Sequence, residues 1–308
     1  MKTKKTNWMF LVIVLFHVGL SFLVSFVPAV YEIMQNMAVN IVVSEITIWL
    51  PAVLFLAVGE PRSAVCCGLK KVHISTALMT VLFILLLEPL ITVVNALSML
   101  VTDNTVAGIS DQIIQLPLPG MLLGIAVYGP FAEELVFRGV IHRSYRQRGN
   151  RLKALLLSSL LFGLMHMNLN QACYAFVIGI ALALLVEATG SILPAFIAHF
   201  CVNGLSVVLM YIVDGLSAGA MEKILEAAES SISGEELLAV ICVYTFIATC
   251  STPLAGCALA WIAGREGRRE EMRELWRSRR IKGDRLMSVP LALGMLICLA
   301  VIVLQLIL

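Results

Sequence analysis

Charged residues are scarce in this sequence. Asp, Glu, Lys and Arg make up 14% of its 308 residues, against about 25% in an ordinary soluble domain. Aromatic residues are also few, at 7%, whereas 60% of the chain is hydrophobic and the mean hydropathy is +0.94. So few charges cannot cover the surface of a soluble protein of this size. They also exclude a disordered chain and a nucleic-acid-binding protein.

Cysteine patterns typical of disulfide scaffolds and zinc sites are absent as well. The chain has eight cysteines but no CxxC pair and no Cys/His pattern with zinc spacing. Six of the eight lie inside apolar runs, where cysteine behaves as a small hydrophobic residue. We therefore predict neither a disulfide framework nor a structural metal ion.

Long apolar runs are what the sequence does contain. A helix needs about 20 mainly apolar residues to cross a bilayer, and the candidate runs cover residues 8–30, 37–58, 75–101, 118–141, 152–168, 171–188, 191–213, 237–263 and 288–308. The first run is longer than the apolar part of a signal peptide, so we expect it to remain as an anchor. The runs predict an all-α, polytopic membrane bundle of about eight to nine transmembrane helices, with residues 1–308 forming one membrane domain.

The basic residues indicate the orientation of this bundle. If the N-terminus is inside, segments 1–7, 59–74, 142–153 and 264–287 are cytoplasmic and hold 3, 3, 5 and 9 of the Lys and Arg residues, or 20 of 22. Basic residues accumulate in short cytoplasmic loops. We therefore predict nine helices, a cytoplasmic N-terminus and an external C-terminus. In segment 265–285, Arg and Glu alternate around Trp276, which fits either an interfacial amphipathic helix or a solvated loop, and we favour the loop.

Several ionisable residues lie inside the apolar runs, where a charge costs at least about 2.5–3.5 kcal/mol. We expect Glu187 to be solvated at a helix end. Glu45 and Glu88 stand alone in their runs, and we interpret both as helix-packing groups. Of the histidines, His73 and His142 fall in predicted cytoplasmic loops, and His17 has no polar neighbour in its run.

A denser polar cluster occupies the run 118–141. Glu134 and Arg138 are four residues apart, so they share a helix face and can pair. Glu133 is rotated about 100° from Glu134 and has no partner on its own helix. It is either a second structural carboxylate or a general base. Pro130, one turn upstream, is expected to free the carbonyl of Ala126 and to kink the helix or open it to water.

Two histidines in other runs lie at a similar depth. His166 follows Phe162 by four residues, and His199 precedes Asn203 by four. At about 1.5 Å per residue from the inner helix ends, Glu133, His166, His199 and Asn203 lie about 15, 22, 12 and 18 Å into the membrane. Each histidine alone is typical of a hydrogen-bonded packing group. Three runs with polar groups at one depth instead favour a shared site.

The motifs Glu133-Glu134-x-x-x-Arg138, Phe162-x-x-x-His166 and His199-x-x-x-Asn203 resemble the CPBP family, the CAAX protease and bacteriocin-processing proteins, also called Abi proteins. The resemblance spans residues 118–207, which would be the motif-bearing catalytic core, and it leaves the substrate open.

The resemblance implies an intramembrane endopeptidase of the glutamic type, related to the Ras-converting CAAX endopeptidase. Glu133 and His166 would activate a water, and His199 and Asn203 would donate hydrogen bonds to the oxyanion. Glu134, Arg138 and Phe162 would support them, without a metal ion or cofactor. The expected partners are the lipid bilayer and a membrane-associated peptide or protein, such as a CAAX-like, pheromone or bacteriocin-type substrate, and the expected location is a bacterial cell membrane.

Three alternatives remain open at this point. Glu133, His166 and His199 could instead form a His₂Glu zinc site. Intramembrane Glu, His and Arg residues also occur in proton-coupled transporters, although no repeated half is apparent here. Finally, the chain could be a catalytically silent scaffold or immunity protein that binds a peptide.

Overall fold

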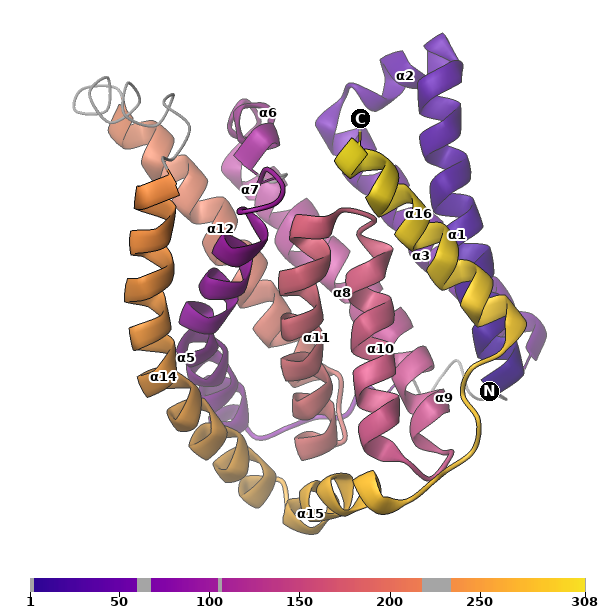
Figure 1. Cartoon of the computed structure of the whole chain (residues 1–308), viewed down its shortest axis with the longest axis vertical. Helices are drawn as coiled ribbons and strands as arrows, with labels where there is room; N and C mark the ends of the chain where they lie inside the picture. Colours follow the sequence, from indigo (N-terminus) through magenta and orange to yellow (C-terminus); the bar gives the residue numbers. More distant parts are fainter. Residues whose placement is uncertain (1–2, 60–67, 105–106, 218–233, 308) are drawn as a thin grey trace.

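The computed structural model describes residues 3–59, 68–104, 107–217 and 234–307, and every regular element in these ranges is a helix (Figure 1). The longer helices are α1 (Thr3–Phe26), α3 (Met37–Gly59), α5 (Ile74–Ser98), α10 (Arg151–Met165), α11 (Leu169–Thr189), α12 (Leu193–Ser217), α14 (Gly234–Arg265) and α16 (Val289–Ile307). The shorter ones are α2 (Pro28–Met34), η1 (Ala107–Ile109), α6 (Ser110–Ile114), α7 (Leu118–Met121), η2 (Leu122–Tyr128), α8 (Gly129–Glu134), η3 (Leu135–His142), α9 (Arg143–Arg146), α15 (Arg269–Arg277) and η4 (Ser278–Arg280).

Eight helices in the described ranges are long and apolar enough to cross a membrane, which confirms the predicted all-α polytopic bundle. One of them, Leu118–Arg146, is a continuous span built from α7, η2, α8, η3 and α9. The ninth predicted run, 152–168, does form a helix, α10. With 15 residues it rises only about 22 Å, which is short of the hydrocarbon thickness of about 30 Å. It is therefore a short helix inside the bundle. The prediction that this run crosses the membrane as a ninth full span is wrong.

The two larger of the four hydrophobic clusters divide most of the long helices into groups. One core joins α1, α3, η3, α10 and α16, and the other joins α5, α11, α12 and α14. Figure 1 shows α16 and α1 on one side of the molecule, α5 and α14 on the opposite side, and α8, α10 and α11 between them. The motif-bearing helices thus lie in the centre of the bundle, where side chains of both groups surround them.

The segments predicted to be cytoplasmic meet at one end of the bundle. Asn7 bonds the carbonyl of Leu286 and receives a hydrogen bond from Tyr145. The Ser191 hydroxyl donates to the carbonyl of Lys70 at 2.6 Å, and Glu266 accepts from Thr76 at 2.5 Å. Residues from the N-terminus, the loop before α5, the α9–α10 connection and the α14–α16 connection therefore share one face, as the distribution of basic residues requires.

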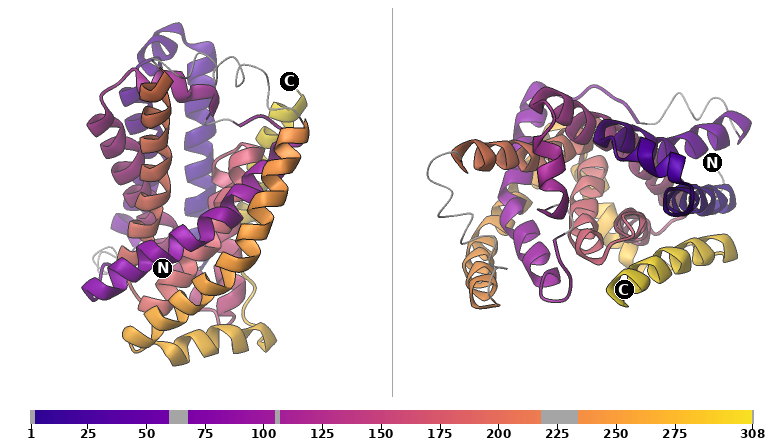
Figure 2. Two further views of the ribbon diagram at one scale, coloured as in Figure 1. Left: turned by 90° about the vertical axis from the view of Figure 1, so that its left-hand side faces the viewer. Right: turned by 90° about the horizontal axis from the view of Figure 1, so that it is seen from above.

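Segment 265–285 differs from the solvated loop that we favoured. It contains α15, which lies across this end of the bundle, beneath the upright helices (Figures 1 and 2). Leu275 is buried, whereas Trp276 is exposed beside Arg279. Glu271 bonds Arg151 and Arg146. The amphipathic interpretation is thus correct, and ion pairs to the α9–α10 connection stabilise the helix.

The environments of Glu187 and His142 also differ from those predicted. We expected Glu187 to be solvated and His142 to lie in a loop, yet both are completely buried. His142 Nε2 lies 3.1 Å from Glu187 Oε1, and Arg146 Nε lies 2.7 Å from the same oxygen. The helix through Leu118–Arg146 continues beyond the predicted end at 141, so it carries both basic groups onto α11.

The shared face generates a topology prediction. A reporter fused after Arg148 should read as cytoplasmic, because this connection joins the basic end of the bundle. A reporter fused at Asp103, beyond the opposite end of α5, should read as external. Paired phosphatase and fluorescent-protein fusions measure both positions. Equal readings at the two positions would contradict the single crossing by α5, and exchanged readings would reverse the predicted orientation.

The ion pairs of α15 predict a pH-dependent stability. The hydrogen bond from Arg151, together with neighbouring arginine charges, holds the pKa of Glu271 below its ordinary value of 4.5. Stability from this group is therefore present above pH 4.5 and is lost as the pH falls through the lower pKa of the folded state. Glu271→Gln should lower the melting temperature of the detergent-solubilised protein slightly at neutral pH and have no effect well below pH 4.5.

Asp284→Asn is the matched control for Glu271→Gln. Asp284 is far more exposed and pairs with Arg148 at 3.4 Å, so its replacement should leave the melting temperature nearly unchanged. A Glu271→Gln effect that persists unchanged at acidic pH would exclude ionisation of Glu271 as its cause.

Candidate active site

The helix that carries the first motif departs from α-helical geometry. The segments η2 and η3 on either side of α8 are π-helical, with hydrogen bonds between residues five apart. Gly129 accordingly bonds the carbonyl of Gly124. Because Pro130 has no N–H, the carbonyl left free in this register is that of Ile125 and not of Ala126, as α-helical spacing predicted. Asn203 Nδ2 on α12 donates to that carbonyl at 3.0 Å, so the proline leaves a site at which the motif-bearing segment is joined to α12.

Glu134 lies between two basic side chains. Its Oε1 atom accepts a hydrogen bond from Arg138 Nη1 at 2.8 Å, which confirms the predicted pair, and lies 3.0 Å from His199 Nδ1. All three side chains are buried. Arg138 Nη2 lies 3.4 Å from the carbonyl of Gly179 on α11. One carboxylate oxygen therefore connects the motif-bearing span to α12, and Arg138 extends the connection to α11.

Glu133 reaches the same imidazole from the other side. Its Oε2 atom lies 3.5 Å from His199 Nε2, and its side chain retains 13% exposure. The guanidinium hydrogen bonds of Arg138 go instead to Glu134 and to the carbonyl of Gly179. The structure thus separates the two adjacent carboxylates: Glu134 is held by cations, whereas Glu133 faces His199 from a partly open position.

Phe162 is the centre around which the remaining site residues pack. Arg138 lies over its ring, 4.2 Å from the centroid. The rings of His166 and His199 meet it edge-on, with centroids 5.1 and 5.7 Å away. These contacts fix the orientation of both imidazoles and bring His166 and His199 to one aromatic side chain.

His166 lies at the end of α10 and not deep inside a span. The helix ends at Met165 and Met167 adopts a left-handed conformation with φ of 51°. His166 Nδ1 lies 3.0 Å from the carbonyl of Phe162. A carbonyl only accepts, so Nδ1 carries the proton, and in the neutral ring Nε2 keeps its lone pair.

Local sequence explains why α10 and α11 hold these groups so closely. Asn150 and Asn168 cap the two helices, each accepting a hydrogen bond from the backbone three residues on. Gly163 permits the contact, since a Cβ there would lie 2.7 Å from the carbonyl of Ala172. Gly179 similarly leaves room for Ser159 and Phe162. The two glycines therefore allow Phe162 and Arg138 to approach α11.

Sequence reasoning missed the contribution of α3. Glu45, interpreted as a packing group, lies against Gly129, where a Cβ would be 3.1 Å from Glu45 Oε1. Trp49, one turn along α3, donates from Nε1 to the hydroxyl of Tyr128 at 2.8 Å. The signal available in the sequence was Gly129, which has no side chain to obstruct α3. His17 also has a polar partner, since its Nδ1 lies 3.0 Å from Thr47 Oγ1.

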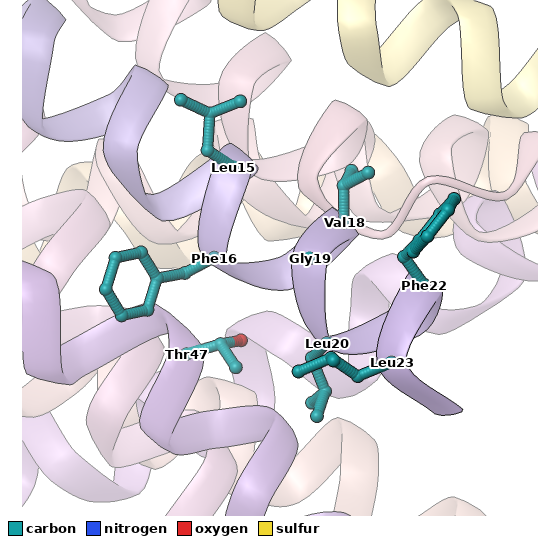
Figure 3. A pocket seen from close by; sticks show the side chains of 8 residues that line it. All are labelled: Leu15, Phe16, Val18, Gly19, Leu20, Phe22, Leu23 and Thr47. Atoms are coloured by element: carbon teal, nitrogen blue, oxygen red, sulfur yellow. The ribbon is translucent and has the colours of Figure 1, made fainter. Parts of the chain in front are cut away.

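An apolar groove of about 690 Å³ lies between α1 and α3 (Figure 3). Thr47 is the one polar side chain on its wall. Many of the others are half-exposed, including Leu15, Phe16 and Phe22. None of the lining residues belongs to the motifs, and they lie on two candidate spans. We therefore expect lipid chains to cover this groove and assign it no part in the chemistry. Its walls are formed by Leu15, Phe16, Val18, Gly19, Leu20, Phe22, Leu23 and Thr47.

The arrangement does not fit a metal centre. Within the described ranges, no three His, Cys, Asp or Glu side chains lie close enough to hold a metal ion. His199 directs its two ring nitrogens to Glu134 and Glu133, and His166 directs Nδ1 to a backbone carbonyl. Glu133, His166 and His199 therefore do not converge as the His₂Glu alternative requires.

A polytopic helical membrane protein with a buried Glu, Arg, His and Asn cluster is the class that the fold and site define. Residues 115–205 match the family described as type II CAAX prenyl endopeptidase Rce1-like. The chain is also 32% identical over 108 residues to "Putative membrane peptidase YdiL" of Bacillus subtilis (strain 168), an alignment covering 35% of this chain and 43% of that relative. No solved structure matches.

Both matches are to CAAX-type or membrane peptidases, the kind of protein that the motifs of this chain resemble, and the family match covers residues 115–205. The matched segment contains every motif residue from Glu133 to Asn203. The chain spans less than half of the length of the Bacillus relative.

The position of Glu134 generates a stability prediction. Glu134→Gln should destabilise the protein by about 3–5 kcal/mol, because it leaves the buried Arg138 without its anion. Thermal unfolding of the protein in detergent measures the loss. Glu270→Gln is the control, since Glu270 pairs with Arg273 and Arg277 on an exposed surface and should change stability by less than about 1 kcal/mol. Equal effects of the two substitutions would contradict a structural role for the Glu134 pair.

Proposed function

We propose that this protein is an intramembrane endopeptidase that hydrolyses a membrane-associated peptide or protein. The observation that carries the proposal is the pairing of His199 with both Glu133 and Glu134, in a chain that matches a CAAX-type peptidase family over residues 115–205. It provides a partly open carboxylate for proton transfer next to an imidazole that a second carboxylate holds in place.

Water activation is assigned to Glu133 and His166. A general base must reach the proton that it removes, directly or through one water. Glu133 keeps an open side, and the hydrogen bond of Arg138 goes to Glu134. His166 has its Nδ1–H bound to the Phe162 carbonyl, which leaves Nε2 as an acceptor for a water proton. The water oxygen would then attack the scissile carbonyl carbon.

Oxyanion stabilisation is assigned to His199 and Asn203. With Nδ1–H donated to Glu134, His199 can donate from Nε2 to the oxyanion only when both ring nitrogens carry a proton. Asn203 uses one amide hydrogen on the Ile125 carbonyl and has a second for the substrate. Donors fixed in a dry site stabilise developing charge strongly.

The substrate class follows from the setting of the site. Glu133, His166 and Asn203 belong to helices within a membrane bundle, so the scissile segment must itself be membrane-associated. CAAX-like, pheromone and bacteriocin-type substrates meet this requirement, in a bacterial cell membrane with the N-terminus cytoplasmic.

The two alternative functions make different demands on the site. A silent scaffold would bind such a segment without needing an open carboxylate, and a proton-coupled transporter would need a solute path through the bundle. Comparing membrane-associated peptides in cells with the wild type and a Glu133 variant would identify the substrate.

The main prediction concerns Glu133. Glu133→Gln keeps the shape of the side chain but removes the base, so it should lower the cleavage rate by about 10²–10⁴. The measurement is cleavage of a membrane-associated substrate by purified protein in vesicles, with the melting temperature as a check on folding. Undiminished cleavage would remove Glu133 as the base, and absence of cleavage by the wild type towards every membrane peptide would favour the scaffold.

Metal analysis and chelation accompany this measurement. The assigned roles need no metal ion, so strong chelation should leave cleavage unchanged and the purified protein should lack stoichiometric zinc. About one zinc per chain, with inhibition by chelator that added zinc reverses, would reassign Glu133, His166 and His199 as metal ligands while leaving the peptidase proposal intact. Thiol and serine reagents should have no effect.

A further inference from the structure

Glu45 lies at the catalytic segment although it belongs to none of the family motifs. It comes from α3, outside the matched residues 115–205. Its Oε1 atom packs against Gly129, because a Cβ atom added at Gly129 would lie only 3.1 Å from it. Gly129 precedes Glu133 by four residues in α8, so both point to the same helix face. The hydrogen bond between Trp49 and Tyr128 fixes α3 at this position.

Glu45 and Glu133 are two acidic side chains close together in the interior of the bundle. Their carboxyl groups lie close enough for their charges to interact. Glu45 Oε2 is buried without a hydrogen-bond partner. A buried acceptor without a donor is costly, and two adjacent carboxylates in such a site cannot both ionise. A proton held between them removes both costs.

We propose that Glu45 is a positioning residue for Glu133, with the two carboxyl groups sharing a single proton in the resting protein. Glu45 remains the neutral acid and donates a hydrogen bond to the Glu133 carboxylate. This keeps Glu133 the ionised member of the pair and fixes its orientation. The inference rests on the proposed function of Glu133 as the base.

The proton balance of the proposed reaction leaves Glu45 unchanged. Glu133 accepts one proton from water as the water oxygen bonds to the carbonyl carbon. When the C–N bond breaks, that proton passes to the leaving amine nitrogen, and Glu133 returns to its carboxylate form. Glu45 keeps its own proton throughout.

Other titratable groups surround the pair on every side. On the motif-bearing span the neighbours are Glu134 and Arg138, and Arg138 is already paired with Glu134. The other helices packed around the site contribute His199, His166, His17 and Tyr174. Tyr128, next to Gly129 in the sequence, accepts the hydrogen bond from Trp49. Substitutions of Glu45 must therefore be compared with changes that leave this set intact.

The first test measures pH–rate profiles of Glu45 variants in vesicles. Glu45→Gln mimics the neutral acid, so cleavage at neutral pH should stay within a few-fold of the wild type. The alkaline limb should lose the step due to the shared proton, because the amide cannot ionise, and should keep any step due to His199. Glu45→Leu removes the donor and should lower kcat by about 10- to 100-fold with little change in KM, as expected for the loss of one charge-assisted hydrogen bond.

Gly129→Ala tests the geometry without removing a carboxyl group. The added Cβ displaces only the end of a flexible side chain, and alanine favours the helix, so the protein should fold and show the kinetic loss of Glu45→Leu. Glu88→Gln is the matched control, since Glu88 lies on α5, outside the site. It makes the same chemical change in another span and should alter neither kcat nor the profile.

The Glu45 and Glu133 variants separate the carboxyl pair from the peptidase activity. If Glu133→Gln abolishes cleavage but Glu45→Leu has the kcat and profile of the wild type, the pairing is refuted and the peptidase assignment survives. Loss of activity in Glu45→Gln equal to that in Glu133→Gln at every pH would also overturn the pairing.

An infrared measurement tests the pair without any substrate. The protonated-carboxyl band that disappears in Glu45→Gln should shift in frequency in Glu133→Gln, because its hydrogen-bond partner changes from a carboxylate to an amide. An unchanged band in Glu133→Gln would show that Glu45 holds its proton independently, and would overturn the inference whether or not the protein is a peptidase.

Discussion

The contact of one Glu134 oxygen with both Arg138 and His199 is the interaction on which the rest of the site depends. A buried carboxylate is tolerable only when cations and hydrogen bonds compensate for its lost hydration. Here the compensating groups come from its own span and from α12, while Arg138 also contacts Phe162 on α10 and the backbone of α11. The electrostatic requirement of one side chain thus aligns four segments. The adjacent Glu133 is left facing His199 from a partly open position.

A second set of buried and partly buried carboxylates organises the basic end of the bundle. Glu187 pairs with His142 and Arg146, and Glu271 pairs with Arg146 and Arg151. Basic residues that the positive-inside rule places on this face therefore also hold α15 across the helix ends. The orientation signal and the packing of this face depend on the same side chains, so replacing one of these arginines would weaken both.

The departure from α-helical geometry around α8 creates defined contacts with α12 and α3. Pro130 and the π-helical register free the Ile125 carbonyl, and Asn203 occupies it. A residue that the family resemblance assigns to the oxyanion is thereby also a brace between α12 and the catalytic segment. Gly129, next to the proline, leaves the space that Glu45 fills. A glycine and a proline that read as helix breakers in the sequence are thus the points where α3 and α12 dock.

By itself the sequence determined the membrane class, the approximate spans, the shared basic face and the Glu134–Arg138 pair, because apolar length, basic loops and i,i+4 spacing are local properties. It also predicted a common depth for Glu133, His166, His199 and Asn203. Only the tertiary structure decided which nitrogen of His199 faces which carboxylate, that α10 is too short to span, and that His142 and Glu187 are buried together. The same holds for Glu45, whose neighbour Gly129 is 84 residues away in the sequence. Contacts between helices depend on their rotation and packing, which no local pattern in a single span specifies.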